Sequence, residues 1–522
     1  MVLSVNWDAG QGTCFSDNSQ TRPPNGRKVR DWSIVLTYYS RSLYGQIVNY
    51  IRQFVQLFSR GAITEPNWEK IRVLYGWGGN QQPGLYRELC NLTGVQFRNF
   101  TDAQEYYGTR SGRAAFDKCC QEVLASGSVP ELYDAILIDE AQDFGVYFFR
   151  LCYKTLRQPK RLIWGYDEVQ SLEELEIPTA ETLFGKDADG KALIDLDGVY
   201  PGDIEKDMIL YHCYRNPRPV LVAAHAFGLG LRRNGGALQF IDTVLGWQDI
   251  GYQVIGATEG KMIAGQEATL YRPESNSPHV LEKLAGYRNL VSWKSFRDRN
   301  EELQWIIQDV TRNIVEEELR PEEIAIVALD SRKRIAESEY QLLHDGLAQN
   351  GITAVRIGTD SGLDTFRVGG AVTITSVFRA KGNEASLVYV YGFEGVGLTR
   401  KLYEVVKNRN MAFTAMTRTK GWLVLTGTGD IANNLFAEIE AILEQIGKVS
   451  FIIPDMAKIQ RNLETYENQR RRQHIRKSQQ SWEKALRDSA DIDLKDLPPD
   501  LLRQLKRKLL SELNDSESDN ML

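Results

Sequence analysis

The feature that most constrains this chain is an apolar run that ends in two adjacent acids. Residues 135–138 are continuously apolar, and Asp139 and Glu140 follow directly. Such a run predicts a buried strand, and ligands bind at the carboxyl ends of strands in parallel sheets. An aspartate there can hold Mg²⁺, and a glutamate can orient and deprotonate a water that attacks a terminal phosphate. Taken alone, the two acids are equally typical of an ordinary exit from a strand.

Other apolar runs alternate with helical patterns along the chain, as in the helix predicted over 42–51. Strands are predicted at 33–38, 70–75, 135–138, 161–166, 208–210, 323–329, 355–357, 371–375, 387–391 and 422–426. This alternation indicates an α/β fold of parallel sheets with helices on both faces. Because 522 residues exceed what one core usually serves, we expect more than one domain.

Four regions are expected. Residues 1–31 are irregular and rich in turn formers, and 32–205 form a first lobe with a helical insertion at about 84–127. A second lobe spans 206–450. Residues 451–522 form a charged helical tail whose end is disordered.

Composition excludes several classes of protein. No apolar run reaches the roughly 18 residues of a membrane span, and the start does not resemble a signal peptide. The six cysteines form no CxxC pair and the five histidines show no metal-ligand spacing, so a reduced cytoplasmic compartment is predicted. A net charge of −6 does not favour nucleic-acid binding, but only the binding groove must be basic.

The segment Asp139-Glu140-Ala141-Gln142-Asp143 resembles motif II of the UvrD-like superfamily 1 helicases, and other helicase motifs follow in order. Tyr166 replaces the usual glycine of motif III, and Phe378 replaces the usual histidine of motif V. The similar segments are 36–43 (motif Ia), 75–79 (the place of motif Ib), 166–171 (motif III), 210–216 (motif IV), 376–384 (motif V) and 411–420 (motif VI).

The resemblance implies two RecA-like lobes of the P-loop NTPase class and an ATP-dependent DNA helicase or translocase that uses ATP and Mg²⁺. Asp139 would hold the metal, Glu140 would activate water, Gln170 would sense the γ-phosphate, and Arg215 and Arg418 would reach it. Glu384 would lie near the ribose, with Gln142, Asp167 and Gly382 as further nucleotide contacts. Single-stranded DNA or RNA would contact Thr37, Tyr38, Arg41, Trp77, Ser376 and Phe378. For Trp77, core packing is an equal alternative.

No segment before the first predicted strand has the full sequence pattern of a phosphate-binding loop. The nearest segment, Gly10-Gln11-Gly12-Thr13-Cys14, resembles the family's loop, but Thr13 and Cys14 stand where lysine and threonine are usual. The N-terminus is therefore consistent with replacement, truncation or another reading frame. Between 358 and 370 there is no room for the large accessory domain of the UvrD, Rep and PcrA helicases. The second hypothesis is a helicase-like protein without ATPase activity that clamps nucleic acid or scaffolds a partner such as a nuclease.

Overall fold

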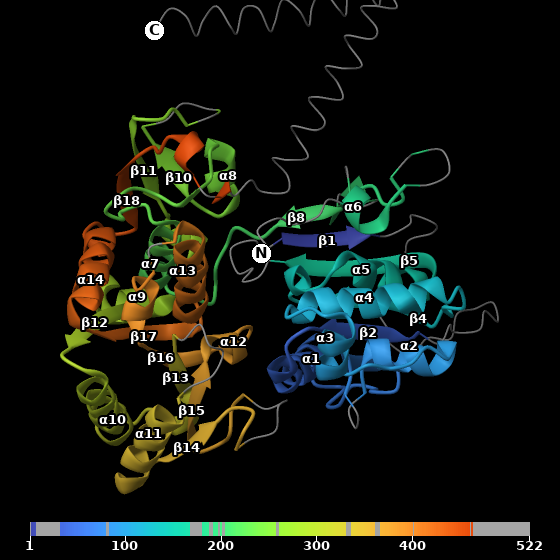
Figure 1. Cartoon of the computed structure of the whole chain (residues 1–522), viewed down its shortest axis with the longest axis horizontal. Coiled ribbons are helices and arrows are strands. Elements are labelled where there is room, and N and C mark those ends of the chain that lie inside the picture. The colour runs from blue at the N-terminus through green and yellow to red at the C-terminus, as the bar shows by residue number, and fades with distance from the viewer. Residues whose placement is uncertain are drawn as a thin grey trace, which may run out of the picture. The chain divides into compact units, whose positions relative to one another are not determined.

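A computed structural model gives the fold of the chain (Figure 1). It describes residues 2–6, 32–79, 83–166, 180–186, 190, 192–196, 199–200, 204–256, 260, 262–329, 336–360, 366–399, 401–459 and 461–462. All of these belong to one compact unit, Met1–Glu464. Most of the irregular N-terminal region and the predicted tail beyond 462 lie outside the described residues.

The first lobe is built on a six-stranded sheet in the order β3-β2-β4-β5-β1-β8. β2, β3, β4 and β5 are parallel, whereas β1 pairs antiparallel with both β5 and β8. The strands are β1 (Val2–Asn6), β2 (Ile34–Tyr38), β3 (Ile71–Tyr75), β4 (Tyr133–Ile138), β5 (Leu156–Tyr166) and β8 (Asp207–Ile209). Strands β6 (Val199–Tyr200) and β7 (Ile204–Glu205) form a separate pair.

The helices of this lobe are α1 (Tyr44–Phe58), α2 (Leu85–Thr93), α3 (Phe100–Tyr106), α4 (Gly112–Ala125), α5 (Val146–Thr155) and α6 (Ala180–Phe184), with 3-10 turns η1 (Arg41–Leu43) and η2 (Ala141–Asp143). α2, α3 and α4 lie within the residues predicted as a helical insertion, about 84–127. Side chains define two of these helix starts, since Asn99 caps α3 and Ser111 caps α4 by accepting backbone N–H bonds.

The second lobe has a six-stranded parallel sheet in the order β12-β17-β16-β13-β15-β14. Its strands are β12 (Val291–Phe296), β13 (Ile324–Ala328), β14 (Thr353–Arg356), β15 (Ala371–Ser376), β16 (Ala385–Tyr391) and β17 (Thr419–Thr428). The helices are α7 (Arg218–Leu229), α9 (Val280–Ala285), α10 (Arg299–Val315), α11 (Glu337–Gln349), α12 (Val377–Ala380), α13 (Leu402–Met416) and α14 (Gly429–Leu443). Four 3-10 turns join them: η3 (Glu274–Asn276), η4 (Tyr287–Leu290), η5 (Pro321–Glu323) and η6 (Phe393–Val396).

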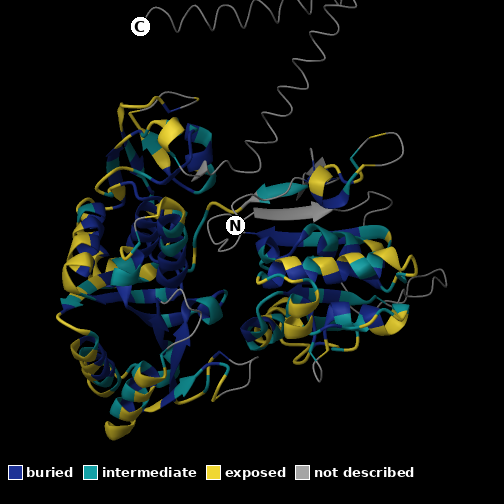
Figure 2. Cartoon of the chain, viewed as in Figure 1, coloured by how far each residue is buried: buried dark blue, intermediate teal, exposed yellow. Residues whose placement is uncertain are grey.

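β13 shows why helices cover both faces of this sheet. Ala325 and Val327 pack into the core that α7, α13 and α14 close, whereas Ile324 and Ile326 pack into the core under α10 and α11. Successive side chains of a strand point to opposite faces, so a strand buried on both faces reads as a continuous apolar run. Figure 2 shows the buried residues concentrated in the strands. The two sheets, which are parallel except for β1, confirm the predicted α/β fold with two RecA-like lobes.

A small antiparallel sheet, β10-β11-β18, was not predicted. It joins β10 (Gln253–Ile255) and β11 (Glu267–Tyr271) to β18 (Lys448–Ile452), and α8 (Val244–Asp249) precedes it. After β18 come η7 (Met456–Lys458) and β19 (Arg461–Asn462), which pairs with β9 (Gln239–Phe240). The expectation that a helical tail begins at 451 is therefore wrong for the residues up to 462 that the structure describes.

The predicted border between the lobes also needs correction. The run at 208–210 was expected to open the second lobe, but β8 pairs with β1 in the first sheet. No helix in the described part of the chain is long and apolar enough to cross a membrane.

Candidate nucleotide cleft and nucleic-acid interface

The two adjacent acids lie at the carboxyl end of β4. The Asp139 backbone N–H donates to the Thr37 carbonyl over 2.9 Å, which ties the end of β4 to the end of β2. Glu140 has a φ of 49°, a left-handed conformation that a glutamate rarely adopts. The Gln142 side-chain amide donates to Glu140 Oε2 over 2.5 Å, so the carboxylate has a fixed direction. Backbone strain of this kind clusters at functional sites.

Asp139 lies in a poorly hydrated position. Removal from water, and secondly the charge of Glu140, raise its pKa from 3.8 to about 7. A cation at this point would stabilise the charged carboxylate. Mg²⁺ prefers oxygen ligands and is usually bound by one or two carboxylates together with substrate phosphates. Asp139 and Glu140 fit that requirement, although the described residues contain no group of three or more potential metal ligands.

A cavity of about 350 Å³ opens in front of these acids. Asp139, Glu140 and Gln142 line one side of it. The segment after β8 supplies the other side, including Cys213 and Arg215. The remaining lining residues are Gly165, Tyr166, Leu210, Tyr211, His212, Tyr214, Asn216, Leu221, His225, Ile250, Arg272, Phe413 and Thr417. The structure therefore brings the predicted motif II and motif IV residues together.

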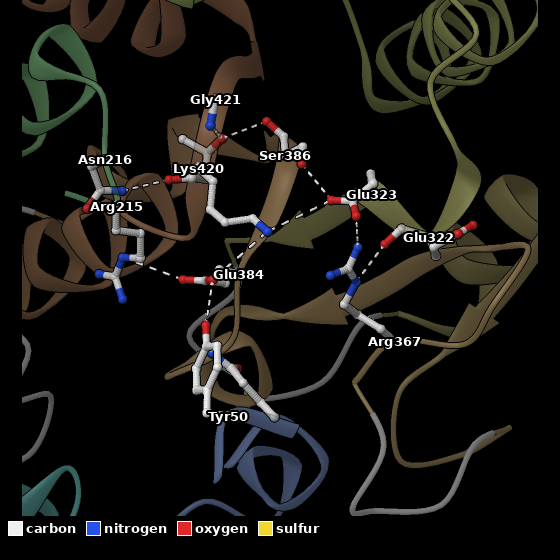
Figure 3. Close-up of polar contacts among 12 residues, drawn as sticks. Tyr50, Arg215, Asn216, Glu322, Glu323, Arg367, Glu384, Ser386, Lys420 and Gly421 are labelled. Carbon is white, nitrogen blue, oxygen red and sulfur yellow. Dashed lines mark hydrogen bonds and ion pairs between the residues drawn. The ribbon is translucent and has the colours of Figure 1, made fainter. Parts of the chain in front are cut away.

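Arg215 is paired with Glu384, the predicted ribose contact (Figure 3). The Arg215 Nε atom lies 3.9 Å from Glu384 Oε2, and it is buried without a hydrogen-bond partner among the described residues. The other oxygen of Glu384 accepts a 3.1 Å hydrogen bond from the Tyr50 hydroxyl on α1. Lys420 Nζ lies 4.0 Å from Glu384 and 4.0 Å from Glu323. Glu384 thus joins residues of both lobes at one carboxylate.

Asn216 is a site residue that the sequence did not reveal. Its side chain is buried and donates to the carbonyls of Thr417 (3.0 Å) and Thr419 (2.7 Å). These bonds fix the segment that carries Arg215 against the end of α13. The available signal was its position next to Arg215, where serine is usual in the family.

Arg418 is placed differently from the prediction. Its side chain is 1% exposed, and it donates to the Thr414 carbonyl over 2.8 Å and to the Thr417 hydroxyl over 3.1 Å. Arg418 does not line the cavity, whereas its neighbour Thr417 does. The last carbonyls of a helix lack intrahelical partners, so a guanidinium can satisfy them. In this structure Arg215 and Arg418 do not meet in one cavity.

The loop between α12 and β16 packs against the first lobe. Gly382 has a φ of 78°, and a Cβ there would lie 2.5 Å from a methyl of Leu43. Asn383 donates to the Ser42 hydroxyl over 2.8 Å. The Lys381 ammonium lies 2.5 Å from Asp143, the last residue of motif II. The predicted motif V segment therefore contacts both η1, directly before α1, and the segment after the acidic strand end.

Two of the predicted nucleic-acid contacts, Trp77 and Tyr38, are buried, and for Trp77 this agrees with the alternative of core packing. Trp77 is 2% exposed, donates to the Arg98 carbonyl over 2.8 Å and stacks on Phe116 at a centroid distance of 4.7 Å. Tyr38 is equally buried and its ring faces Tyr75. Neither ring can stack on a base, because other side chains already cover both.

The other four predicted nucleic-acid contacts are only partly accessible. Thr37 is fully buried, and its hydroxyl has no hydrogen-bond partner in the part of the chain that the structure describes. Ser376 is also buried. Arg41 is half-buried. Phe378 is half-buried as well and packs against the core of the second lobe.

Five predicted nucleotide contacts, Gly10, Gly12, Thr13, Asp167 and Gln170, lie outside the described residues. The direction of β1 concerns the phosphate-binding loop that was predicted at Gly10, Gly12 and Thr13. Val2 pairs with Tyr166 and Asn6 pairs with Leu162, so β1 runs away from the sheet edge at which Asp139 lies. A phosphate-binding loop arises where a parallel strand ends at that edge. The backbone of β1 therefore gives no support to a loop of that kind directly after Asn6.

Comparison with known proteins adds evidence on the second lobe. Residues 371–426, from the start of β15 into β17, match the model of the UvrD-like helicase C-terminal domain. A solved structure described as the C-terminal domain of a possible DNA helicase from Lactobacillus plantarum WCFS1 is similar at 19% identity, over 30% of this chain and 83% of that chain, with a TM-score of 0.22. No curated protein matches the chain. The family match falls on the segment that carries the motif V residues and Arg418.

Proposed function

We propose that this chain is an ATP-dependent helicase or translocase that moves on single-stranded nucleic acid. One observation carries the proposal: the acids Asp139 and Glu140 and the arginine Arg215 line the same cavity. Phosphoryl transfer needs a positioned base and a cation for the charge that builds up on the phosphate. Both are present, and they come from segments that the family uses for these purposes.

Glu140 is the residue proposed to accept a proton from the attacking water. The Gln142 amide and the left-handed backbone at Glu140 hold its carboxylate in one direction. Asp139, with Glu140, would hold Mg²⁺, which neutralises phosphate charge when it is bound. Arg215 would place a permanent positive charge opposite the acids. Its pairing with Glu384 keeps the guanidinium at the cavity wall.

Coupling to movement is proposed from contacts between the lobes. Lys381 contacts Asp143, and Asn383 contacts Ser42, so the loop after α12 touches both η2, which follows the acidic strand end, and η1, which precedes α1. A nucleotide between Glu140 and Arg215 would bind both sides of the cavity and draw them together. We infer that this change is transmitted through the same loop to a bound strand. DNA as the substrate and a cytoplasmic location are part of the proposal.

The second candidate is a helicase-like protein that binds nucleic acid, or a protein partner such as a nuclease, without hydrolysing ATP. The direction of β1 and the residues Thr13 and Cys14 favour it, because the family's phosphate loop requires lysine and threonine there. The retained Glu140 and Arg215 favour the motor, because a binding protein needs neither of them in the cavity.

The test compares ATP hydrolysis by the wild type, Glu140→Gln and Glu105→Gln, each with saturating single-stranded oligonucleotide. Glu105 is a matched control, since it is exposed on α3 and no hydrogen bond or ion pair involves its side chain in the described part of the chain. We expect hydrolysis by the wild type and by the control, and loss of it in Glu140→Gln with nucleotide binding retained. Binding of oligonucleotide without turnover in the wild type would establish the second candidate instead.

A further inference from the structure

A row of aromatic rings runs along the exposed face of α1. Tyr50, Phe54 and Phe58 are 40%, 54% and 81% exposed. They are four residues apart, which on a helix gives a spacing of about 6 Å along the axis. The ring centroids are indeed 6.3 Å and 6.2 Å apart. Contiguous exposure of large apolar side chains marks an interaction surface.

The exposed residues around the rings on α1 are amides and the aliphatic Leu57, which is 68% exposed, and none of them is acidic. The exposed amides Asn49, Gln53 and Gln56 lie on the same helix. From Tyr44 to Thr64 there is no acidic residue, and the charged residues are Arg52 and Arg60. Arg52 pairs with Glu65, whereas Arg60 is exposed and forms no ion pair with any residue that the structure describes. The face therefore offers rings, one leucine, amides and one cation without an ion-pair partner among the described residues.

Ring spacing fits the thickness of nucleobases. Bases in a regular strand are spaced by about 3.4 Å, so one base between two rings needs about 6.8 Å. The observed spacings of 6.2–6.3 Å fall short by about half an ångström, which exposed side chains can supply by small rotations. The rings are tilted by 36° and 33° to each other, so each pair is open on one side.

We propose that α1 is a stacking platform for single-stranded nucleic acid. Bases enter between Tyr50 and Phe54 and between Phe54 and Phe58, and Arg60 contacts the backbone phosphates. Base stacking on aromatic rings tolerates any sequence, and side-chain amides pair with base edges. A docking helix or a second copy of this chain would favour aliphatic side chains where Asn49, Gln53 and Gln56 stand.

The platform has a direct connection to the cleft. The Tyr50 hydroxyl donates to Glu384, and Glu384 pairs with Arg215 in the cavity wall (Figure 3). Burial, and secondly the charge of Glu384, raise the pKa of Tyr50, so the hydroxyl keeps its proton. A base that displaces the Tyr50 ring would change this hydrogen bond. The inference rests on the nucleic-acid ligand of the proposed function but not on ATP hydrolysis.

The test measures binding of a fluorescein-labelled thymidine oligonucleotide of about 20 nucleotides, longer than the roughly 4–16 that one binding fold covers. Affinity is followed by anisotropy without nucleotide, for the wild type, Phe54→Leu and Phe54→Trp. Leucine keeps the apolar character of Phe54 but loses its aromatic face. Tryptophan keeps the aromatic face. We expect Phe54→Leu to weaken binding by about 5-fold to about 150-fold and Phe54→Trp to bind as the wild type does.

Tyr403→Leu is the matched control, because Tyr403 is an exposed ring on α13 of the second lobe. Equal affinity of Phe54→Leu and the wild type, an equal loss in Tyr403→Leu, or no binding by the wild type would each overturn the proposal. Self-association that Phe54→Ala abolishes and Phe54→Leu preserves would assign the face to a second copy. Because no nucleotide is present, loss of the ATPase leaves the outcome of this test unchanged.

Discussion

A buried ion pair behind the cleft gives a sharp test of the packing. Arg409 on α13 forms two hydrogen bonds to Glu438 on α14, of 2.8 Å and 2.7 Å, and both side chains are nearly inaccessible to water. The guanidinium also donates to the Phe227 carbonyl over 2.5 Å and lies 4.4 Å from the centre of the Phe227 ring. Glu438→Gln keeps the shape of the side chain but leaves the Arg409 charge uncompensated.

Removing one partner of a buried pair costs about 3–5 kcal/mol, because the other charge stays buried without compensation. For a lobe of this size, each kcal/mol lowers the melting temperature by about 2–4 °C, so we expect a decrease of about 6–20 °C for Glu438→Gln. Thermal unfolding followed by circular dichroism measures this decrease. Replacement of both Arg409 and Glu438 by methionine should recover most of the loss, because no charge is then buried.

The control for this prediction is Glu274→Gln. Glu274 pairs with Lys283 at 2.9 Å, but both side chains are largely exposed, and surface pairs contribute little. A change in Glu438→Gln no larger than that in Glu274→Gln would refute the reasoning, since the burial of the Arg409 pair would then have no energetic effect.

Three further outcomes follow from the site. Trp77→Phe should reduce the free energy of unfolding by about 1–3 kcal/mol, through loss of the bond to the Arg98 carbonyl and of ring area, and should leave oligonucleotide affinity unchanged in the anisotropy assay. A selective loss of affinity would return Trp77 to the nucleic-acid interface. N-ethylmaleimide should modify Cys213, which lines the cavity, but not Cys90 or Cys152, because burial excludes the reagent and raises their thiol pKa values, that of Cys90 to about 11. Peptide mass mapping reads out each thiol, and protection of Cys213 by a non-hydrolysable ATP analogue is expected, whereas unaltered labelling would contradict nucleotide binding there. Asn216→Ala should lower kcat more than nucleotide affinity, because it removes the two bonds that hold the Arg215 segment to Thr417 and Thr419. An equal effect on both constants would mean that Asn216 serves binding alone.

The sheets of both lobes could be predicted because the sequence of a buried strand is a continuous apolar run. β13 is an example, since burial on both faces leaves no polar position within it. β8 was assigned to the wrong lobe because three residues carry no information about which sheet they join. β18 was missed as part of a sheet because its partner β11 lies far away along the chain.

The candidate site was predictable where a motif sets local geometry. Asp139 and Glu140 fall at the end of β4 because an apolar run stops there, and parallel strands end at a common edge. Burial of single side chains was not predictable in the same way. Tyr38 ends β2 and Trp77 follows β3, but contacts with distant rings, such as that of Trp77 with Phe116, decide whether such side chains face water or the core. Arg418 depends in the same way on carbonyls that only the end of α13 exposes.

For the rings of α1, the sequence predicts the spacing but not the exposure. The apolar face of a helix usually packs on a core, so burial of these rings would be the ordinary expectation. Only the structure shows that Leu43 and Ile47 bury one side of this segment, while Tyr50, Phe54 and Phe58 remain exposed on the other.

The central claim is that nucleic acid and ATP act through one cleft between Glu140 and Arg215. The most direct measurement is the rate of ATP hydrolysis by the full chain as a function of single-stranded oligonucleotide concentration, with Glu140→Gln measured in parallel. The account predicts a rate that rises with oligonucleotide and saturates, and that Glu140→Gln abolishes. A rate that does not respond to oligonucleotide, or one that survives in Glu140→Gln, would contradict it.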